Sequence, residues 1–195
     1  MKKIIITLVI VLSAFISNGQ RSMFGAQNNY VGPVQPAAPV LGAAYGGGKI
    51  FYIFQPGDPG YVAGETHGLI AANSDTQGYR VFGCYSSNWT VSTALGTGAA
   101  NTTTLLGCSE TNFAAKYTKA VTDGGYTDWY LPSKDELNKL YLNRNLVGNF
   151  IDVNYWSSSQ WSPWYWYAWY QSFSDGSQNG DDKNAQKGIR AIRTF

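Results

Sequence analysis

The clearest local signal in this chain is the stretch Trp129-Tyr130-Leu131-Pro132-Ser133-Lys134-Asp135-Glu136-Leu137. Its apolar and aromatic start is typical of a short strand. Ser133 is followed three residues later by Glu136, which is the capping-box pattern that begins a helix. We therefore expect a strand, a turn and then a helix whose buried stripe is Leu137, Leu140 and Tyr141.

The segments on either side of this stretch predict a mixed fold. Before it, β-branched and aromatic runs favour strands at 49–54 and 68–72, and apolar spacing favours a helix at 113–121. Residues 82–107 are rich in Gly, Ser and Thr and predict an irregular segment. After it, strands are expected at 154–159, 167–174 and 188–195, with turns at Ser162-Pro163, Asp175-Gly176 and Asn179-Gly180. Strands, two helices and then strands indicate the α+β class with small antiparallel sheets.

The N-terminus has the pattern of an export signal. Lys2-Lys3 precede an apolar run at 4–16, and Ser17-Asn18-Gly19 supply small residues for cleavage. Residues 1–19 therefore predict a signal peptide, with an uncleaved membrane anchor as the alternative. No other apolar stretch approaches membrane length, so we expect no stable membrane span after cleavage and a periplasmic, cell-surface or secreted location.

The next segment, 20–48, is expected to be a flexible linker. It is rich in Gly, Pro and Asn and has little apolar periodicity, so it offers little surface to offset the entropy of ordering. The folded binding domain is predicted to span 49–195.

The composition excludes several classes of protein. Charged residues make up only 13% of the chain, with 14 Lys and Arg against 12 Asp and Glu, so no basic field exists to hold nucleic acid. Aromatic residues reach 15%, which excludes a disordered polar tail.

Catalytic patterns are not found in the sequence. The single histidine, His67, has no Ser or Cys motif nearby and is expected to be a structural hydrogen-bonding residue. Asp135 and Glu136 open a helix, where a capping role is sufficient. We expect no enzyme activity, no catalytic residue and no cofactor.

Cys84 and Cys108 are the chain's two cysteines, and export favours a disulfide between them. Such a bridge would close a Gly, Ser and Thr-rich loop and add roughly 3 kcal/mol by the entropic estimate. Two separately buried thiols are the alternative. The spacing fits no metal site.

Aromatic residues gather near the C-terminus, where five of the seven tryptophans lie between Tyr155 and Tyr170. Alternation along a strand prevents all of these rings from facing one side: if Trp169 and Phe173 point inward, Tyr170 and Ser172 point outward. An exposed cluster of Trp and Tyr usually marks a binding site. A core that uses tryptophan is the alternative for any single ring.

The polar segment 175–187 follows this cluster. It predicts a hairpin rich in turn formers. Asp181 and Asp182 with Asn179 offer oxygen ligands for Ca²⁺, but their spacing matches no EF-hand loop, so we predict no metal site.

Together the two segments predict a surface for a protein or glycan ligand over 161–187. The aromatic rings would supply apolar area, while Asp181, Asp182 and Lys183 would add polar selectivity at the rim. The candidate ligand-binding residues are Trp161, Trp164, Tyr165, Trp166, Tyr167, Tyr170, Ser172, Asp175, Ser177, Asn179, Asp181, Asp182, Lys183 and Lys187.

Several blocks of this chain together resemble the C-terminal domain of the Legionella collagen-like adhesin. They are 48–53, 66–71, 96–98 with 101–102, 125–133, 136–137, 155–159 and 190–193, so the resemblance covers 49–195. It implies a C-type-lectin-like fold of the formylglycine-generating-enzyme type, and adhesion or ligand binding rather than catalysis. The Glu-Pro-Asn and Trp-Asn-Asp motifs of calcium-dependent sugar binding are absent.

The tail 155–195 also resembles the variable region of proteins diversified by diversity-generating retroelements. Such a tail keeps a fixed framework, here Tyr155, Trp156, Ser157, Ser158, Ala168, Trp169, Gln171, Phe173, Gly176, Gln178, Asn184, Arg190 and Arg193. Residues of mixed chemistry lie between these positions, as in a paratope. The resemblance implies a diversified binding surface. The alternatives are a dedicated adhesin with an invariant site and a structural module of the cell envelope.

Overall fold

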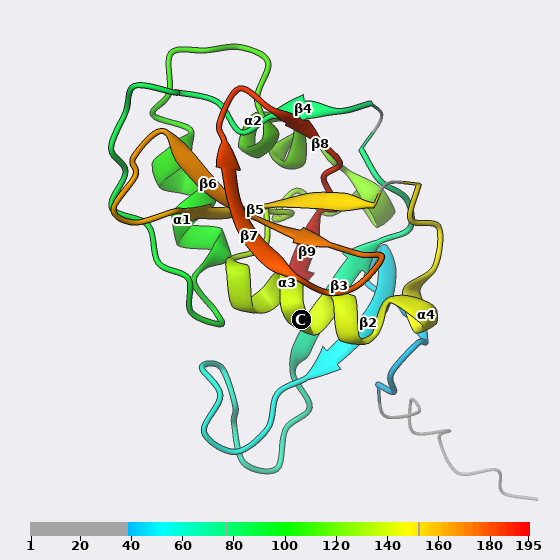
Figure 1. Cartoon of the computed structure of the whole chain (residues 1–195). Helices are drawn as coiled ribbons and strands as arrows, with labels where there is room; N and C mark the ends of the chain where they lie inside the picture. The colour runs from blue at the N-terminus through cyan, green and yellow to red at the C-terminus, as the bar shows by residue number, and fades with distance from the viewer. Residues whose placement is uncertain (1–38, 77, 152) are drawn as a thin grey trace, which may run out of the picture. The chain divides into compact units, whose positions relative to one another are not determined.

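The computed structural model describes residues 39–76, 78–151 and 153–195, which form small antiparallel sheets with helices packed against them (Figure 1). The α+β class expected from the sequence is therefore present. The predicted signal peptide, and the predicted linker up to residue 38, lie outside the described residues. The elements are β1 (Ala44–Tyr45), β2 (Gly48–Ile53), β3 (Gly68–Ala72), β4 (Arg80–Val81), α1 (Gly98–Leu105), α2 (Ala114–Lys119), the 3-10 turn η1 (Asp123–Gly125), α3 (Lys134–Leu142), α4 (Arg144–Val147), β5 (Asn154–Gln160), β6 (Tyr167–Ser172), β7 (Gln178–Asp182), β8 (Gln186–Lys187) and β9 (Ile192–Thr194).

The largest sheet has the strand order β1-β2-β3-β9, so the last strand of the chain lies beside strands from the start of the described part. β3 is buried along its whole length, which fits its central position. β1 pairs with β2 through Ala44 opposite Lys49. The sheet therefore begins before Lys49, within the segment expected to be linker. A two-residue strand carries too weak a pattern to be predicted.

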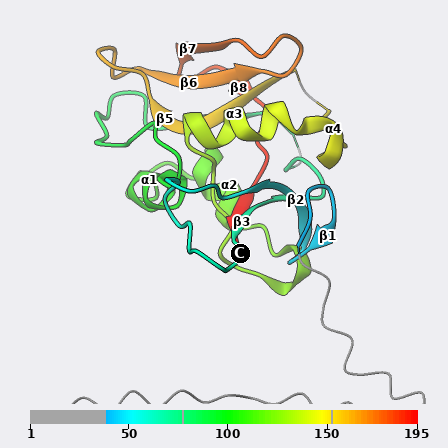
Figure 2. The same cartoon turned by 90° about the horizontal axis from the view of Figure 1, so that it is seen from below.

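Helix α3 begins as the sequence predicts. The Ser133 hydroxyl accepts a hydrogen bond from the Glu136 amide at 3.2 Å, and the Glu136 carboxylate accepts one from the Ser133 amide at 2.7 Å. Leu137 and Leu140 are buried. The helix contacts β5 and β6 on one side and β2 on another, so it lies between the C-terminal sheet and the N-terminal sheet (Figure 2).

Helix α1 was not predicted, because its sequence GAANTTTL has no clear apolar stripe. Buried polar contacts stabilise it instead. The Thr102 hydroxyl donates to the Gly98 carbonyl at 2.8 Å and accepts from the Leu131 amide at 3.0 Å. Cys84 and Cys108 form a disulfide with their Cα atoms 5.9 Å apart, which closes the loop that contains α1.

The third sheet has the order β5-β6-β7 and, together with its connecting loops, carries most of the candidate residues. Asn179-Gly180, expected to be a turn, instead lies inside β7, where Gly180 is opposite Trp169 of β6. Pairing along the full length of β6 outweighs the turn preference of this dipeptide. In the described part of the chain, no helix is long and apolar enough to cross a membrane.

Candidate functional site

The loop between β5 and β6, residues 161–166, is fixed at both ends by backbone hydrogen bonds. The Trp161 amide donates to the Tyr167 carbonyl at 3.0 Å, and the Tyr167 amide donates to the Trp164 carbonyl at 2.9 Å. The Lys183 amide donates to the Trp166 carbonyl at 3.0 Å. We call residues 161–166 the aromatic loop. These hydrogen bonds hold the aromatic loop in a defined conformation beside the sheet.

Large rings at this tip face solvent. Trp164 is 50% exposed and Tyr165 is 40% exposed. Trp166 lies between them, with its ring centroid 5.3 Å from that of Trp164 and 4.7 Å from that of Tyr165. Burial of such rings against a partner stabilises a complex by more than almost any other contact. The aromatic loop is therefore the strongest candidate for the centre of a binding surface.

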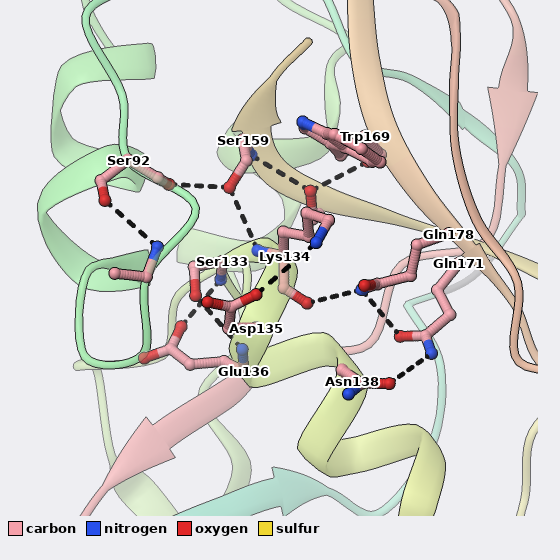
Figure 3. A network of polar contacts seen from close by, with 12 residues as sticks. Ser92, Ser133, Lys134, Asp135, Glu136, Asn138, Ser159, Trp169, Gln171 and Gln178 are labelled. Carbon is pink, nitrogen blue, oxygen red and sulfur yellow. Dashed lines mark hydrogen bonds and ion pairs between the residues drawn. The ribbon is translucent and has the colours of Figure 1, made fainter. Parts of the chain in front are cut away.

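A second aromatic group lies on the sheet itself. Trp161 packs on Trp169 with ring centroids 4.0 Å apart and planes inclined by 35°; we call these two residues the indole pair. The ammonium group of Lys134, from the first turn of α3, lies 4.7 Å from the Trp169 ring (Figure 3). Trp169 was assigned to the framework and Lys134 was not considered in the sequence analysis.

β6 departs from the expected alternation in part: Phe173, just beyond the strand, is buried as expected, but Trp169 and Ser172 are not placed as expected. Trp169 is only partly buried, whereas Tyr170 turns toward the buried Trp156, with ring centroids 6.2 Å apart. Ser172 is only 8% exposed, and its hydroxyl bonds to that of Ser174 at 2.7 Å. Ser172, named as a ligand-binding candidate, is therefore buried, because the face of β6 that carries it packs on the core.

The sheet is attached to α3 by amide side chains. Gln171 donates from Nε2 to Asn138 Oδ1 at 2.9 Å, and Gln178 donates from Nε2 to the Lys134 carbonyl at 2.8 Å (Figure 3). These bonds fix α3 beside the indole pair and bring Lys134 to the candidate surface. Local sequence carries no signal for this, because about 35 residues separate Lys134 from Trp169.

The acidic and polar candidates of segment 175–182 differ in how far their side chains are exposed to solvent. Asp175, Ser177 and Asn179 are exposed, while Asp181 and Asp182 are half-buried. The Ser177 amide donates to Asp175 Oδ1 at 3.0 Å, and hydrogen bonds from Ser177 lower the pKa of the Asp175 carboxyl. These side chains form a polar border beside the aromatic residues.

Lys187 does not extend into solvent. Its ammonium lies 2.6 Å from Asp181 Oδ2 and 4.0 Å from the ring of Tyr170, and the residue is 7% exposed. The other Asp181 oxygen accepts the Asp182 amide at 2.8 Å. Lys187 thus neutralises Asp181 within the protein, and its expected role as a ligand contact is not supported by this placement.

Lys183 was expected at the rim and is instead fully buried, at 0% exposure. Its ammonium donates to the Ser87 carbonyl at 2.8 Å and to Gln160 Oε1 at 2.9 Å. Burial lowers the pKa of Lys183 to about 8, although nearby Glu110 opposes the shift. Because Gln160 directly precedes the aromatic loop, Lys183 holds the loop to the disulfide-closed segment and cannot itself reach a ligand.

The depressed pKa of Lys183 predicts a pH effect on stability. Between the folded pKa of about 8 and the ordinary value of 10.5, the unfolded chain binds the proton and the folded one does not. Stability contributed through this residue therefore rises with pH across that window, by roughly 3 kcal/mol in total. Lys183→Met should lack this rise. Chemical denaturation of both proteins from pH 7 to 10 measures it, and parallel pH curves would contradict the assignment.

Segment 84–92, part of the disulfide-closed loop, borders the aromatic loop. The Trp89 amide donates to Gln160 Oε1 at 3.0 Å, and Gln160 Nε2 donates to Asn88 Oδ1 at 2.6 Å. Tyr85 in this segment is 41% exposed. Local sequence carries no signal for this neighbour, because the contact joins positions some 70 residues apart.

Other polar groups show structural contacts. The ring of His67 bonds to the Phe195 carbonyl at 3.1 Å and to Glu65 at 2.7 Å, and the Glu65 bond raises the pKa of His67. Within the described ranges, Cys84, Cys108 and Glu110 are the one set of metal-type ligands close together, but the two sulfurs are bonded to each other.

Comparison with known families gives one match. The family model described as the Lcl C-terminal domain matches residues 83–193, which is more than half of the chain and includes the disulfide, α3 and all three strands of the C-terminal sheet. No curated protein matches the chain.

Proposed function

The chain belongs to the Lcl C-terminal domain family, and on that basis we propose that it is an exported, adhesin-like protein that binds a protein or glycan ligand. The binding surface consists of the aromatic loop, the indole pair and the polar border of Asp175, Ser177, Asn179 and Asp182. Binding is a reversible association without a chemical step, and the protein is not an enzyme.

The observation that carries this proposal is the exposure of Trp164 and Tyr165 on a loop with fixed ends. Surface tryptophan and tyrosine in an ordered loop supply large contact area and lose little conformational freedom when a ligand binds. The polar border beside them matches the usual plan of an interface, in which an apolar centre is surrounded by polar side chains.

The pattern of exposure along the tail supports diversification of the binding surface. Most framework positions of the tail are buried, including Trp156, Gln171 and Arg190, while Trp164 and Asn179 between them are exposed. We propose that the fold is the C-type-lectin-like one and that it presents variable residues on a constant core. Ser172, Lys183 and Lys187 are exceptions, since all three are buried. Population sequencing of the gene tests this: changes confined to the exposed positions support it, and an invariant tail contradicts it.

Replacing Trp164 and Trp166 together by Ala tests the binding surface. A random-peptide phage library and a printed glycan array, screened with the wild-type protein, supply the probes. We expect the double variant to lose affinity for the recovered probes by roughly 30-fold or more, because truncation of central aromatic residues typically costs 2 kcal/mol or more. The melting temperature should change little, since these rings project from the sheet.

The matched control is Tyr61→Ala with Tyr79→Ala, which removes two exposed rings elsewhere on the described surface. It should leave probe binding unchanged. A large fall in melting temperature of the Trp164 and Trp166 variant would instead indicate a packing role, and unaltered binding would exclude the aromatic loop as the site.

A further inference from the structure

The indole of Trp161 lies directly on Gly180 of β7. A Cβ atom at residue 180 would overlap Cδ2 and Cε3 of the Trp161 ring and lie 2.9 Å from its Cγ. Real Cβ atoms do not approach ring atoms so closely, so the indole occupies the space that any side chain at this position would need.

Backbone conformation does not require glycine at this position. The backbone φ angle of Gly180 is not positive, and the residue pairs with Trp169 in regular antiparallel register. A residue with a side chain can therefore adopt this backbone without strain. The need for glycine comes from the ring above it.

The position of the indole determines the second half of the binding surface. Resting on Gly180, Trp161 stacks on Trp169 at a centroid separation of 4.0 Å, and Lys134 lies 4.7 Å from the Trp169 ring. Together these groups make a continuous apolar area with one cation beside it. If the indole rose from β7, this area would be broken into two separate rings.

We propose that Gly180 is a specificity-determining residue of the binding surface. Without a side chain, it lets Trp161 lie on β7 and complete the indole pair; any larger residue displaces the indole and changes the shape offered to a ligand. This inference rests on the proposed binding function but names a position outside the candidate set. Residue 180 acts by placing Trp161.

The test compares Gly180→Ala with Trp161→Phe by circular dichroism. Two stacked indoles couple their electronic transitions and produce a paired positive and negative band, which is lost when the rings separate. We expect the difference spectrum between the wild type and Gly180→Ala to match that between the wild type and Trp161→Phe. Retention of the coupled band in Gly180→Ala would overturn the proposal.

A double-mutant cycle shows whether the clash with the ring is the cause. In the wild-type background, Gly180→Ala should lower the melting temperature by several degrees; in the Trp161→Ala background it should have no effect or a small stabilising one, since alanine is then free of the ring. Equal effects in both backgrounds would exclude the clash. Asn179→Ala, the neighbouring position on β7, is the control and should leave the coupled band intact.

The same proteins separate this proposal from the proposed function. The probes selected on the wild type should bind Gly180→Ala more weakly than they bind the wild type. If Gly180→Ala loses the coupled band and still binds every probe equally, residue 180 does not determine specificity, although the aromatic loop can still be the site. If the Trp164 and Trp166 variant loses probe binding while Gly180→Ala keeps it, the aromatic loop is the site and residue 180 does not determine specificity.

Discussion

Replacing Arg190 by Met is expected to lower the free energy of unfolding by roughly 3–5 kcal/mol, because it leaves a buried carboxylate without its partner. Arg190 is fully buried and Asp75 is 8% exposed, with Arg190 Nε 2.6 Å from Asp75 Oδ1. The same guanidinium donates to the Asn149 carbonyl at 2.6 Å and to the Ala72 carbonyl at 3.1 Å. The substitution therefore removes a charge and several buried hydrogen bonds together.

The partner carboxylate also serves neighbouring groups. Asp75 Oδ2 accepts the Tyr155 hydroxyl at 2.6 Å and the Ile151 amide at 3.0 Å. This network joins β3 to the segment before β5. Its loss should therefore weaken the packing of the C-terminal sheet against the rest of the fold. Urea denaturation at neutral pH measures the change.

Arg144→Met is the matched control for this experiment. Arg144 stacks on Tyr141 at 4.0 Å and donates to the Tyr141 carbonyl at 2.9 Å, but it is only half-buried and its described contacts include no carboxylate. Its replacement should cost less than about 1 kcal/mol. If Arg190→Met proved as mild as this control, the Asp75 pair would not be a main stabilising contact.

The elements predicted well are those whose cause lies within a few residues. The capping box of Ser133 and Glu136 fixes the start of α3 locally, and the strands predicted at 154–159 and 167–174 cover most of β5 and all of β6. Spacing and capping chemistry decide such elements before tertiary contacts form. The disulfide between Cys84 and Cys108 was predicted from the expected export and from the presence of a single pair of cysteines, and it is confirmed.

The errors arose where distant contacts override local preference. Asn179-Gly180 has the strongest turn sequence in the tail, yet it lies in β7 because β6 pairs with it and Trp161 covers it. Lys183 was predicted to be a charged residue at the rim of the binding surface. It is buried instead, because the Ser87 carbonyl and Gln160 provide hydrogen-bond acceptors for its ammonium group. A single sequence does not show which distant acceptors will surround a lysine.

The resemblance to a family gave positions whose physical roles only the structure explains. Arg190 and Arg193 were assigned to the scaffold, and each meets a carboxylate far away in the chain: Arg190 meets Asp75, and Arg193 Nε lies 2.7 Å from Asp128 Oδ1. Arg193 also lies 3.8 Å from the Tyr126 ring. These two arginines attach the C-terminal segment to the segments that carry Asp75 and Asp128.

Replacing Glu136 by Ala should destabilise the fold by about 3 kcal/mol, because the buried Ser133 amide and the Gly96 amide both lose their acceptor. Glu136 is fully buried, with Oε2 accepting the Ser133 amide at 2.7 Å and Oε1 accepting the Gly96 amide at 3.0 Å. It thus joins the start of α3 to the loop that leads into α1. Asp135→Ala, in the same helical turn but exposed, should cost under about 1 kcal/mol and serves as the control.

The pH dependence of Glu136→Gln separates the carboxyl's hydrogen bonds from its charge. Burial raises the pKa of Glu136 above its ordinary value of 4.5, although the amide donors oppose this shift. Since the folded pKa lies above the unfolded one, the stability linked to protonation is fully present below the unfolded value and is lost as pH rises through the folded pKa. Glutamine does not titrate, so the deficit of Glu136→Gln relative to wild type should be largest in acid and shrink as pH rises. Denaturation curves from pH 4 to 8 measure this, and a deficit that grows with pH would show that the ionised carboxylate, rather than the neutral acid, is the form the fold favours.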